Sequence, residues 1–109
     1  MTIVDSTYIE LNYQKTIDQA AALEEVASNL SKLSDEDMNK MIKEIGAAWE
    51  GDNATAYVGK VGILQGNVKK TSDKIKTTAA TIRQMAENIR QTELENLRIA
   101  MERTYETNQ

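Results

Sequence analysis

Apolar and small residues recur every three or four positions along the first half of the chain. This spacing keeps one apolar face turned the same way along a helix. The members of this stripe are Ile9, Tyr13, Ile17, Ala20, Leu23, Ala27, Leu30, Ser34, Met38, Met41, Ile45 and Trp49. Thr7 and Glu10 have the spacing of a capping box, which marks a helix start. The pattern therefore predicts a first helix over residues 7–49.

A second start signal lies inside this first helix. Ser34 is followed by Asp35, Glu36 and Asp37, which is typical of an N-cap with an acidic first turn. Because the apolar stripe continues past this point, we expect a kink there rather than a full break.

The second half of the chain has a seven-residue repeat. One set of positions, typical of a in a coiled coil, is Ala54, Val61, Val68, Ile75, Ile82 and Ile89. The set three residues later, typical of d, is Tyr57, Leu64, Thr71, Thr78, Met85 and Thr92. This repeat predicts a second helix over residues 54–92 with an a/d seam. The register changes after Ile89, so the tail 93–105 is predicted to be helical or bent.

A turn at residues 50–53 would bring the two helices together in antiparallel fashion. Ser34 then comes opposite Val68, and the acidic residues 35–37 come near Lys69 and Lys70. We therefore predict a single all-α domain over residues 1–109: an antiparallel helix-turn-helix hairpin.

Composition excludes several classes of function. The chain has 109 residues, with no cysteine, histidine or proline, and a net charge of −4. Ser-His-Asp triads and Cys/His zinc sites are therefore impossible within it. The acidic balance also opposes nucleic-acid binding. The glycine-containing stretch at 59–66 lies on the heptad repeat and follows no strand, so it is no phosphate loop. We expect no enzyme, no cofactor and no metal site.

Further apolar residues lie beside the main stripes, where a hairpin of two helices cannot bury them. Three glycines spaced three and four residues apart would let another backbone approach the second helix closely. The alternative is that these glycines only loosen the helix start. We expect a dimer or partner interface made of Val26, Leu33, Ile42, Val58, Gly59, Gly62, Ile63 and Gly66.

The only tryptophan of the chain stands at the predicted turn, in Trp49-Glu50-Gly51. Gly51 can adopt the positive φ that closes the first helix, and Asp52 or Asn53 can cap the second. We expect the Trp49 indole to pack over the bend, near Ala54 and Tyr57. If the indole is exposed instead, a recognition signal is the alternative to a role in folding.

The motif Trp49-x-Gly51, the small Ala54 and the aromatic Tyr57 resemble the early secreted antigenic target family of type VII secretion. These are small W-x-G proteins of about a hundred residues, and the resemblance covers essentially the whole chain. It implies a homo- or heterodimeric four-helix bundle. It also implies export without a cleaved signal peptide after a cytoplasmic stage. The implied partners are a second copy or another small W-x-G protein, together with the type VII secretion machinery.

Many members of that family carry a C-terminal Tyr-x-x-x-Asp/Glu export signal. This chain departs from the pattern, because Tyr105 is followed four residues later by Gln109 and not by an acidic residue. Either a partner supplies the signal, or a degenerate export tail does so. That tail would consist of Met101, Glu102, Tyr105 and Glu106. The departure also leaves open a targeting chaperone that binds the N-terminal helical domain of a larger secreted toxin. Two lesser alternatives remain: a membrane-active helical protein, disfavoured because its polar faces are acidic, and a cytosolic coiled coil.

Overall fold

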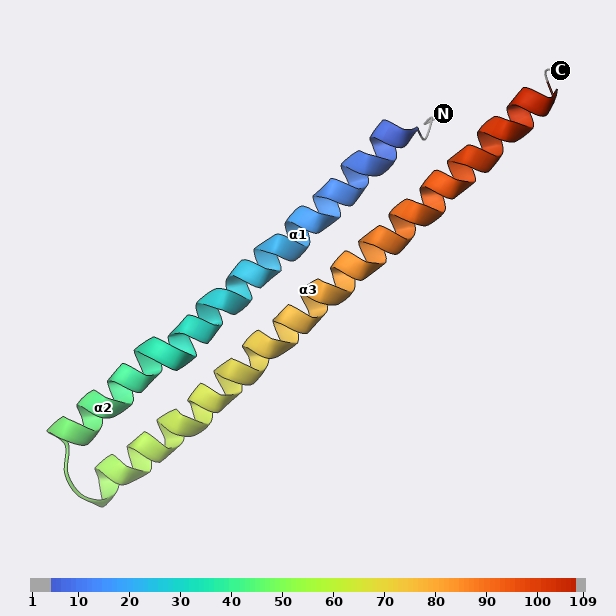
Figure 1. The fold of residues 1–109 in the computed structure, drawn as a ribbon. Coiled ribbons are helices and arrows are strands. Elements are labelled where there is room, and N and C mark those ends of the chain that lie inside the picture. The colour runs from blue at the N-terminus through green and yellow to red at the C-terminus, as the bar shows by residue number, and fades with distance from the viewer. Residues whose placement is uncertain (1–4, 108–109) are drawn as a thin grey trace. The chain divides into compact units, whose positions relative to one another are not determined.

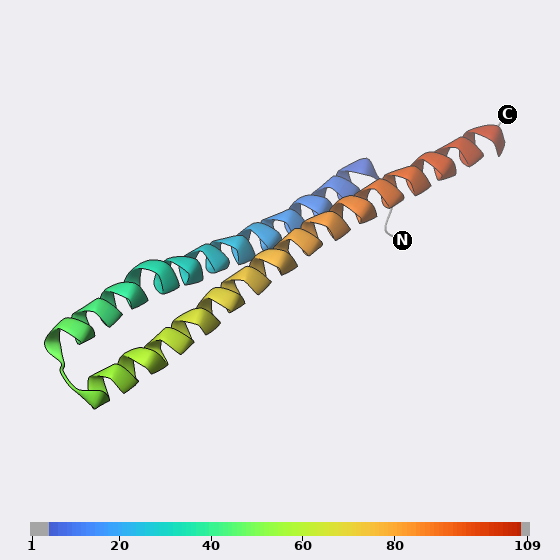
Figure 2. The same cartoon turned by 60° about the horizontal axis from the view of Figure 1, so that its bottom comes forward.

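The computed structural model describes residues 5–107, which are almost entirely helical (Figure 1). Helix α1 spans Ser6–Lys32, and a π-helical turn, η1, spans Leu33–Asp37. Helix α2 spans Met38–Ala48, and helix α3 spans Asp52–Thr107. Within the described range there is no strand, which confirms the all-α helical hairpin. The change of register after Ile89 does not interrupt α3, which Figure 2 shows as one continuous helix.

The contacts divide the chain into two compact units. The first unit combines Met1–Ala21 with Ala79–Gln109, and the second unit is Ala22–Thr78. Helices α1 and α3 contribute residues to both units, whereas η1, α2 and the turn belong to the second. Each unit pairs a segment from the first half of the chain with a segment of α3.

Asp5, rather than Thr7, caps the start of α1. The Tyr8 backbone N–H donates to Asp5 Oδ1 at 2.9 Å, and the Ile9 N–H donates to the Asp5 carbonyl at 3.1 Å. These bonds satisfy donors that the first turn of a helix leaves unpaired. The capping box predicted from Thr7 and Glu10 is therefore wrong, and Glu10 is engaged elsewhere, with Arg90.

Small residues form most of the buried seam in both units. The buried residues of the second unit are Ala27, Ser34, Met38, Ala54, Val61 and Ser72. Those of the first unit are Ile9, Ala20, Ala79 and Ala86. Alanine and serine side chains let two helix backbones approach closely, so the helices pack along these residues.

The predicted a/d seam of α3 is wrong at its d positions. Leu64 and Met85 are both 55% exposed, and Tyr57 is exposed as well. The residues buried in place of the d positions are Ser72, Ala79 and Ala86. Each follows an a position by four residues on the same helix. Because these residues are small, that stripe can lie closest to the facing helix, and the larger d side chains turn outward.

The turn between α2 and α3 is short. Trp49 adopts an extended conformation, with φ −111° and ψ 145°, and its N–H donates to the Ile45 carbonyl at 2.9 Å. Gly51 has φ +93°, as predicted, a conformation that favours glycine. Its role differs from the prediction, because its carbonyl accepts the Thr55 N–H at 3.2 Å. Gly51 thus belongs to the start of α3 rather than to the end of the preceding helix.

Candidate interaction surface

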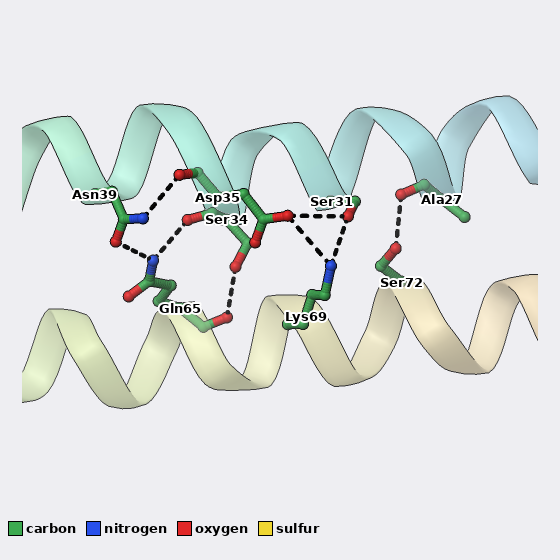
Figure 3. A network of polar contacts seen from close by, with 8 residues as sticks. All are labelled: Ala27, Ser31, Ser34, Asp35, Asn39, Gln65, Lys69 and Ser72. Carbon is green, nitrogen blue, oxygen red and sulfur yellow. Dashed lines mark hydrogen bonds and ion pairs between the residues drawn. The ribbon is translucent and has the colours of Figure 1, made fainter.

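The π-helical turn η1 is held by a polar side chain from α3 (Figure 3). The Met38 N–H donates to the Leu33 carbonyl, five residues back, rather than to the Ser34 carbonyl. The Ser34 carbonyl accepts a hydrogen bond from Gln65 Nε2 at 2.7 Å instead. The buried Ser34 hydroxyl donates in turn to the Gln65 carbonyl at 3.2 Å. Where the sequence predicted a kink, the helix therefore continues through one wider turn.

Neighbouring polar groups extend this contact along η1 and α2 (Figure 3). Gln65 Nε2 also donates to Asn39 Oδ1 at 2.6 Å, and Asn39 Nδ2 donates to the Asp35 carbonyl at 2.8 Å. We call Ser34, Asp35, Asn39 and Gln65 the polar layer. Ser34 hydrogen-bonds with Gln65, which lies about one helical turn before the Val68 predicted opposite it.

Two further polar contacts join the helices of the second unit. Lys69 Nζ lies 3.2 Å from Asp35 Oδ2 and donates to Ser31 Oγ at 2.8 Å. This ion pair confirms the expected proximity of Lys69 to the acidic residues 35–37. The fully buried Ser72 hydroxyl donates to the Ala27 carbonyl at 2.7 Å. Ser72 and Ser34 thus fill the small-residue seam and satisfy backbone groups at the same time.

The inward face of α2 differs from the prediction at one position. Met38 is buried and Ile42 is half-buried, whereas Met41 is exposed. The prediction that Met41 belongs to the inward stripe is therefore wrong. A π-helical turn accommodates one more residue than an α-helical turn, and Ile42 takes the inward place expected of Met41, whereas Met38 and Ile45 face inward as expected.

Trp49 packs against Tyr57 across the turn. The ring centroids lie 5.5 Å apart at an interplanar angle of 48°, which is a favourable tilted arrangement. The Trp49 side chain is nevertheless 52% exposed. A surface hollow of about 270 Å³ lies beside it, lined by Gly46, Trp49, Gly51, Ala54, Thr55 and Val58. Trp49 is therefore both part of the turn and part of the surface.

The residues expected to form an interface differ in exposure. Ile63 is 69% exposed, and Val26 and Leu33 are exposed as well. Ile42, Val58 and Gly62 are half-buried, whereas Gly59 and Gly66 are exposed. A Cβ atom built on any of the three glycines would meet no atom within 4 Å other than its chain neighbours and the backbone of its own helix. The surface around these glycines is therefore open among the described residues.

In the first unit, Arg90 joins α3 to the start of α1. Its guanidinium donates to both carboxylate oxygens of Glu10 at 3.0 Å and lies 5.3 Å from the centre of the Tyr13 ring. The hydrogen bond to Glu10 raises the pKa of Arg90. A groove of about 310 Å³ lies beside this cluster, lined by Ile9, Asn12, Tyr13, Thr16, Gln19, Ile82, Met85, Ala86, Ile89, Arg90 and Glu93. Sequence reasoning missed this cluster because its members are separated by about eighty residues.

The C-terminal part of α3 carries its own ion pairs. Arg98 lies 2.6 Å from Glu95 and 2.6 Å from Glu102, and its hydrogen bond lowers the pKa of Glu95. Of the proposed export tail, Met101 and Glu102 are exposed. Tyr105 and Glu106 belong to α3, but their side chains lie outside the described part of the structure, as does Gln109.

The chain matches the family described as "Proteins of 100 residues with WXG" over residues 8–94, a range that includes Trp49 and Gly51. It belongs to the WXG100 family. WXG100 proteins are small helical proteins associated with type VII secretion, and they typically pair with other W-x-G proteins and with the secretion machinery. They are not known as enzymes. No curated protein and no solved structure matched the chain significantly.

Residues 5–107 also bear on two other kinds of site. No group of three or more acidic side chains there is placed to hold a metal ion. None of the helices in this range has an apolar stretch long enough to cross a membrane.

Proposed function

We propose that this WXG100 protein is a small type VII secretion substrate or partner that acts as a homo- or heterodimeric interaction module. The observation that carries the proposal is the distribution of side chains by size. Alanine and serine make up most of the buried seam, while Leu64, Met85 and Ile63 are more than half exposed. Large apolar residues are normally the ones buried in a folded protein.

The spacing of the exposed residues supports this proposal further. Val26 of α1 and Leu33 of η1 are seven residues apart, and Tyr57 and Leu64 are seven residues apart on α3. Residues seven apart lie on nearly the same face of a helix. Exposed apolar side chains in such rows mark an interaction site better than single ones.

The proposed interface comprises Val26, Leu33, Ile42, Val58, Gly59, Gly62, Ile63 and Gly66, with Tyr57 and Leu64 added from the structure. Helices of a partner would lie on this surface and complete a four-helix bundle. The open surface at the three glycines supports close approach of a partner helix.

Export would take the protein out of the cell without a cleaved signal peptide. In that scheme Trp49 and Gly51 provide the motif, and the tail from Met101 to Glu106 serves as a looser signal. The alternative role is a targeting chaperone for the N-terminal helical domain of a larger secreted toxin. The missing Tyr-x-x-x-Asp/Glu spacing favours this alternative, because a chaperone could leave with the signal of its client.

Charged substitutions on the proposed interface test the module. Leu33→Lys combined with Ile63→Lys changes two exposed side chains, so helicity should be kept while association is lost. Ala80→Lys changes an exposed residue outside the proposed interface and serves as the matched control. Association that survives in the double variant would contradict the proposed interface.

Secretion tests the role in the cell. The protein should appear in the medium of cells that carry an active type VII system, and it should stay inside cells whose export ATPase is deleted. Co-expression with each neighbouring gene product separates the two roles, because a chaperone should co-purify with a long toxin. Equal amounts in the medium with and without the ATPase would contradict both roles.

A further inference from the structure

Two lysines border an exposed row of side chains on α3 in the second unit. The row, which we call the α3 row, consists of Tyr57, Leu64 and Thr71, spaced seven residues apart. Lys60 follows Tyr57 by three residues and precedes Leu64 by four. Lys74 follows Thr71 by three residues. Because residues three or four apart are neighbours on the surface of a helix, both lysines lie directly beside the α3 row.

Both of these lysines are exposed, and neither has an ion pair or a side-chain hydrogen bond with another of residues 5–107. Lys69 differs, because it pairs with Asp35 and donates to Ser31 (Figure 3). Lys69 follows Leu64 by five residues, which places the two side chains about 140° apart around the helix. The ion pair therefore lies on one flank of the unit, and the α3 row with its two lysines lies on the other.

The first half of the unit is divided in the same way. Leu33 and Asp35 stand directly before and after the buried Ser34. One residue is a step of roughly a quarter of a turn, so these two side chains lie on opposite sides of the seam. Because Asp35 pairs with Lys69, Leu33 lies on the same flank as Leu64. We call this the apolar flank, since it carries exposed apolar side chains from both halves of the unit.

Charge is divided unequally between the two halves of this unit. Its part of α3, residues 52–78, has five lysines and two aspartates, which gives a net charge of +3. Residues 22–48 have six acidic side chains and three lysines, which gives a net charge of −3. The α3 side of the apolar flank is thus positive in a chain whose net charge is −4. Such a border attracts a partner whose facing border is negative and repels a positive one.

We propose that the apolar flank binds a helix of a different small protein, whose apolar stripe is bordered by two carboxylates two heptads apart. These carboxylates pair with Lys60 and Lys74, which are fourteen residues, or two heptads, apart. Apolar contact with the α3 row supplies most of the affinity, and the two lysines select the partner by charge. The inference rests on the proposed function, because it names the chemistry of the partner at the same surface.

A second copy of this chain matches the lysines less well. Its own α3 would bring lysines against lysines. Its first half has exposed carboxylates beside Met41, at Asp37 and Glu44, but these are only seven residues apart. They suffice for one of the two lysines and leave the other without a partner. A different protein with carboxylates at both positions satisfies the whole border.

Two labelled helical peptides test the charge preference on the full chain. Both have the same stripe of leucines and about 28 residues, which is long enough to span the α3 row. One has glutamate and the other has lysine at two positions beside the stripe, fourteen residues apart. Fluorescence anisotropy gives the dissociation constant of each peptide. At low salt we expect the acidic peptide to bind about tenfold more tightly, because two exposed pairs change from attraction to repulsion.

Charge reversal on the protein assigns the preference to the two lysines. We expect Lys60→Glu combined with Lys74→Glu to bind the basic peptide more tightly than the acidic one. Lys70→Glu combined with Lys76→Glu is the matched control, because it changes the net charge equally at two exposed lysines of the same helix. Neither control position is three or four residues from a member of the α3 row, so this variant should keep the original preference. Far-UV circular dichroism checks that both variants keep their helicity.

Equal affinity of the two peptides for the unsubstituted chain, or no binding of either, would overturn the inference even if a variant fails to fold. So would a preference that the Lys60 and Lys74 double variant keeps or that the control also reverses. A homodimer that this double variant dissociates and the control does not would overturn it as well, because a second copy would then be the occupant. Light scattering on mixtures of full chains judges the proposed function separately, since association there does not require the charge preference.

Discussion

Replacement of Trp49 by alanine tests how far the motif tryptophan stabilises the turn. Removing a fully buried tryptophan costs about 3–5 kcal/mol. Since the Trp49 side chain is 52% exposed, roughly half of that loss applies, and we expect the free energy of unfolding to fall by about 2 kcal/mol. The contact with Tyr57, at 5.5 Å between ring centroids, supplies part of this value.

A double-mutant cycle isolates the aromatic part. Trp49→Ala, Tyr57→Leu and the double variant should show a coupling energy of about 0.5–1.5 kcal/mol, as other aromatic pairs do. Urea unfolding followed by far-UV circular dichroism gives each value. All four chains must be measured at one protein concentration, because association would raise the apparent stability.

Tyr8→Ala serves as the control, since Tyr8 is a partly exposed aromatic residue at the start of α1. It should leave the coupling between Trp49 and Tyr57 unchanged. A loss below about 0.5 kcal/mol for Trp49→Ala would be within the range of ordinary surface substitutions. That result would refute the role of the indole in stabilising the turn and leave it as a recognition element alone.

Three further predictions follow from the seam, the first cap and the tail. Ala79→Leu should destabilise the protein by about 1–3 kcal/mol in urea unfolding, because Ala79 is fully buried in a seam of small residues; an unchanged midpoint would contradict that close packing. Asp5→Ala should cost about 1 kcal/mol and speed amide exchange at Tyr8 and Ile9, whereas Asp5→Asn should keep most of the cap. Because Arg98 lowers the pKa of Glu95 in the folded helix, the pair stabilises this region above the unfolded pKa of a glutamate, and the contribution is lost as pH falls through the lowered value. NMR titration of the Glu95 carboxyl should give a lowered pKa that returns to the ordinary range in Arg98→Gln, and equal values in both chains would contradict the pairing.

The sequence predicted the helices and the inward stripe of α1 well. Ile9, Ala20 and Ala27 are buried as the three-and-four spacing indicates. The spacing depends only on the turn of a helix, so it is readable without knowledge of the partner. The motif residues at the turn were also recognisable, and the positive φ of Gly51 followed from its place between two helices.

The seam of α3 could not be chosen from periodicity alone. Its d positions and the small residues one position later both repeat every seven residues, and the sequence analysis favoured the larger side chains. The structure buries Ser72, Ala79 and Ala86 instead, because small residues permit the closest approach of two helices. Their repeat at seven residues was the signal that could have identified this seam.

The wider turn η1 and the cluster around Arg90 were beyond sequence reasoning for different reasons. The π-helical turn is accompanied by a hydrogen bond from Gln65 of α3 to the Ser34 carbonyl, a contact between helices that no local pattern contains. The bond between Arg90 and Glu10 depends on the alignment of segments eighty residues apart. The displacement of Met41 by Ile42 follows from the first of these and was therefore missed as well.

The central claim is that the large apolar side chains outside the small-residue seam exist to bind other helices. Size-exclusion chromatography with multi-angle light scattering tests it directly, with the chain alone at micromolar concentration and mixed with each small helical protein encoded beside it. We predict twice the mass of one chain for the protein alone, or a one-to-one complex with one of those proteins. A monomer in every mixture would contradict the claim.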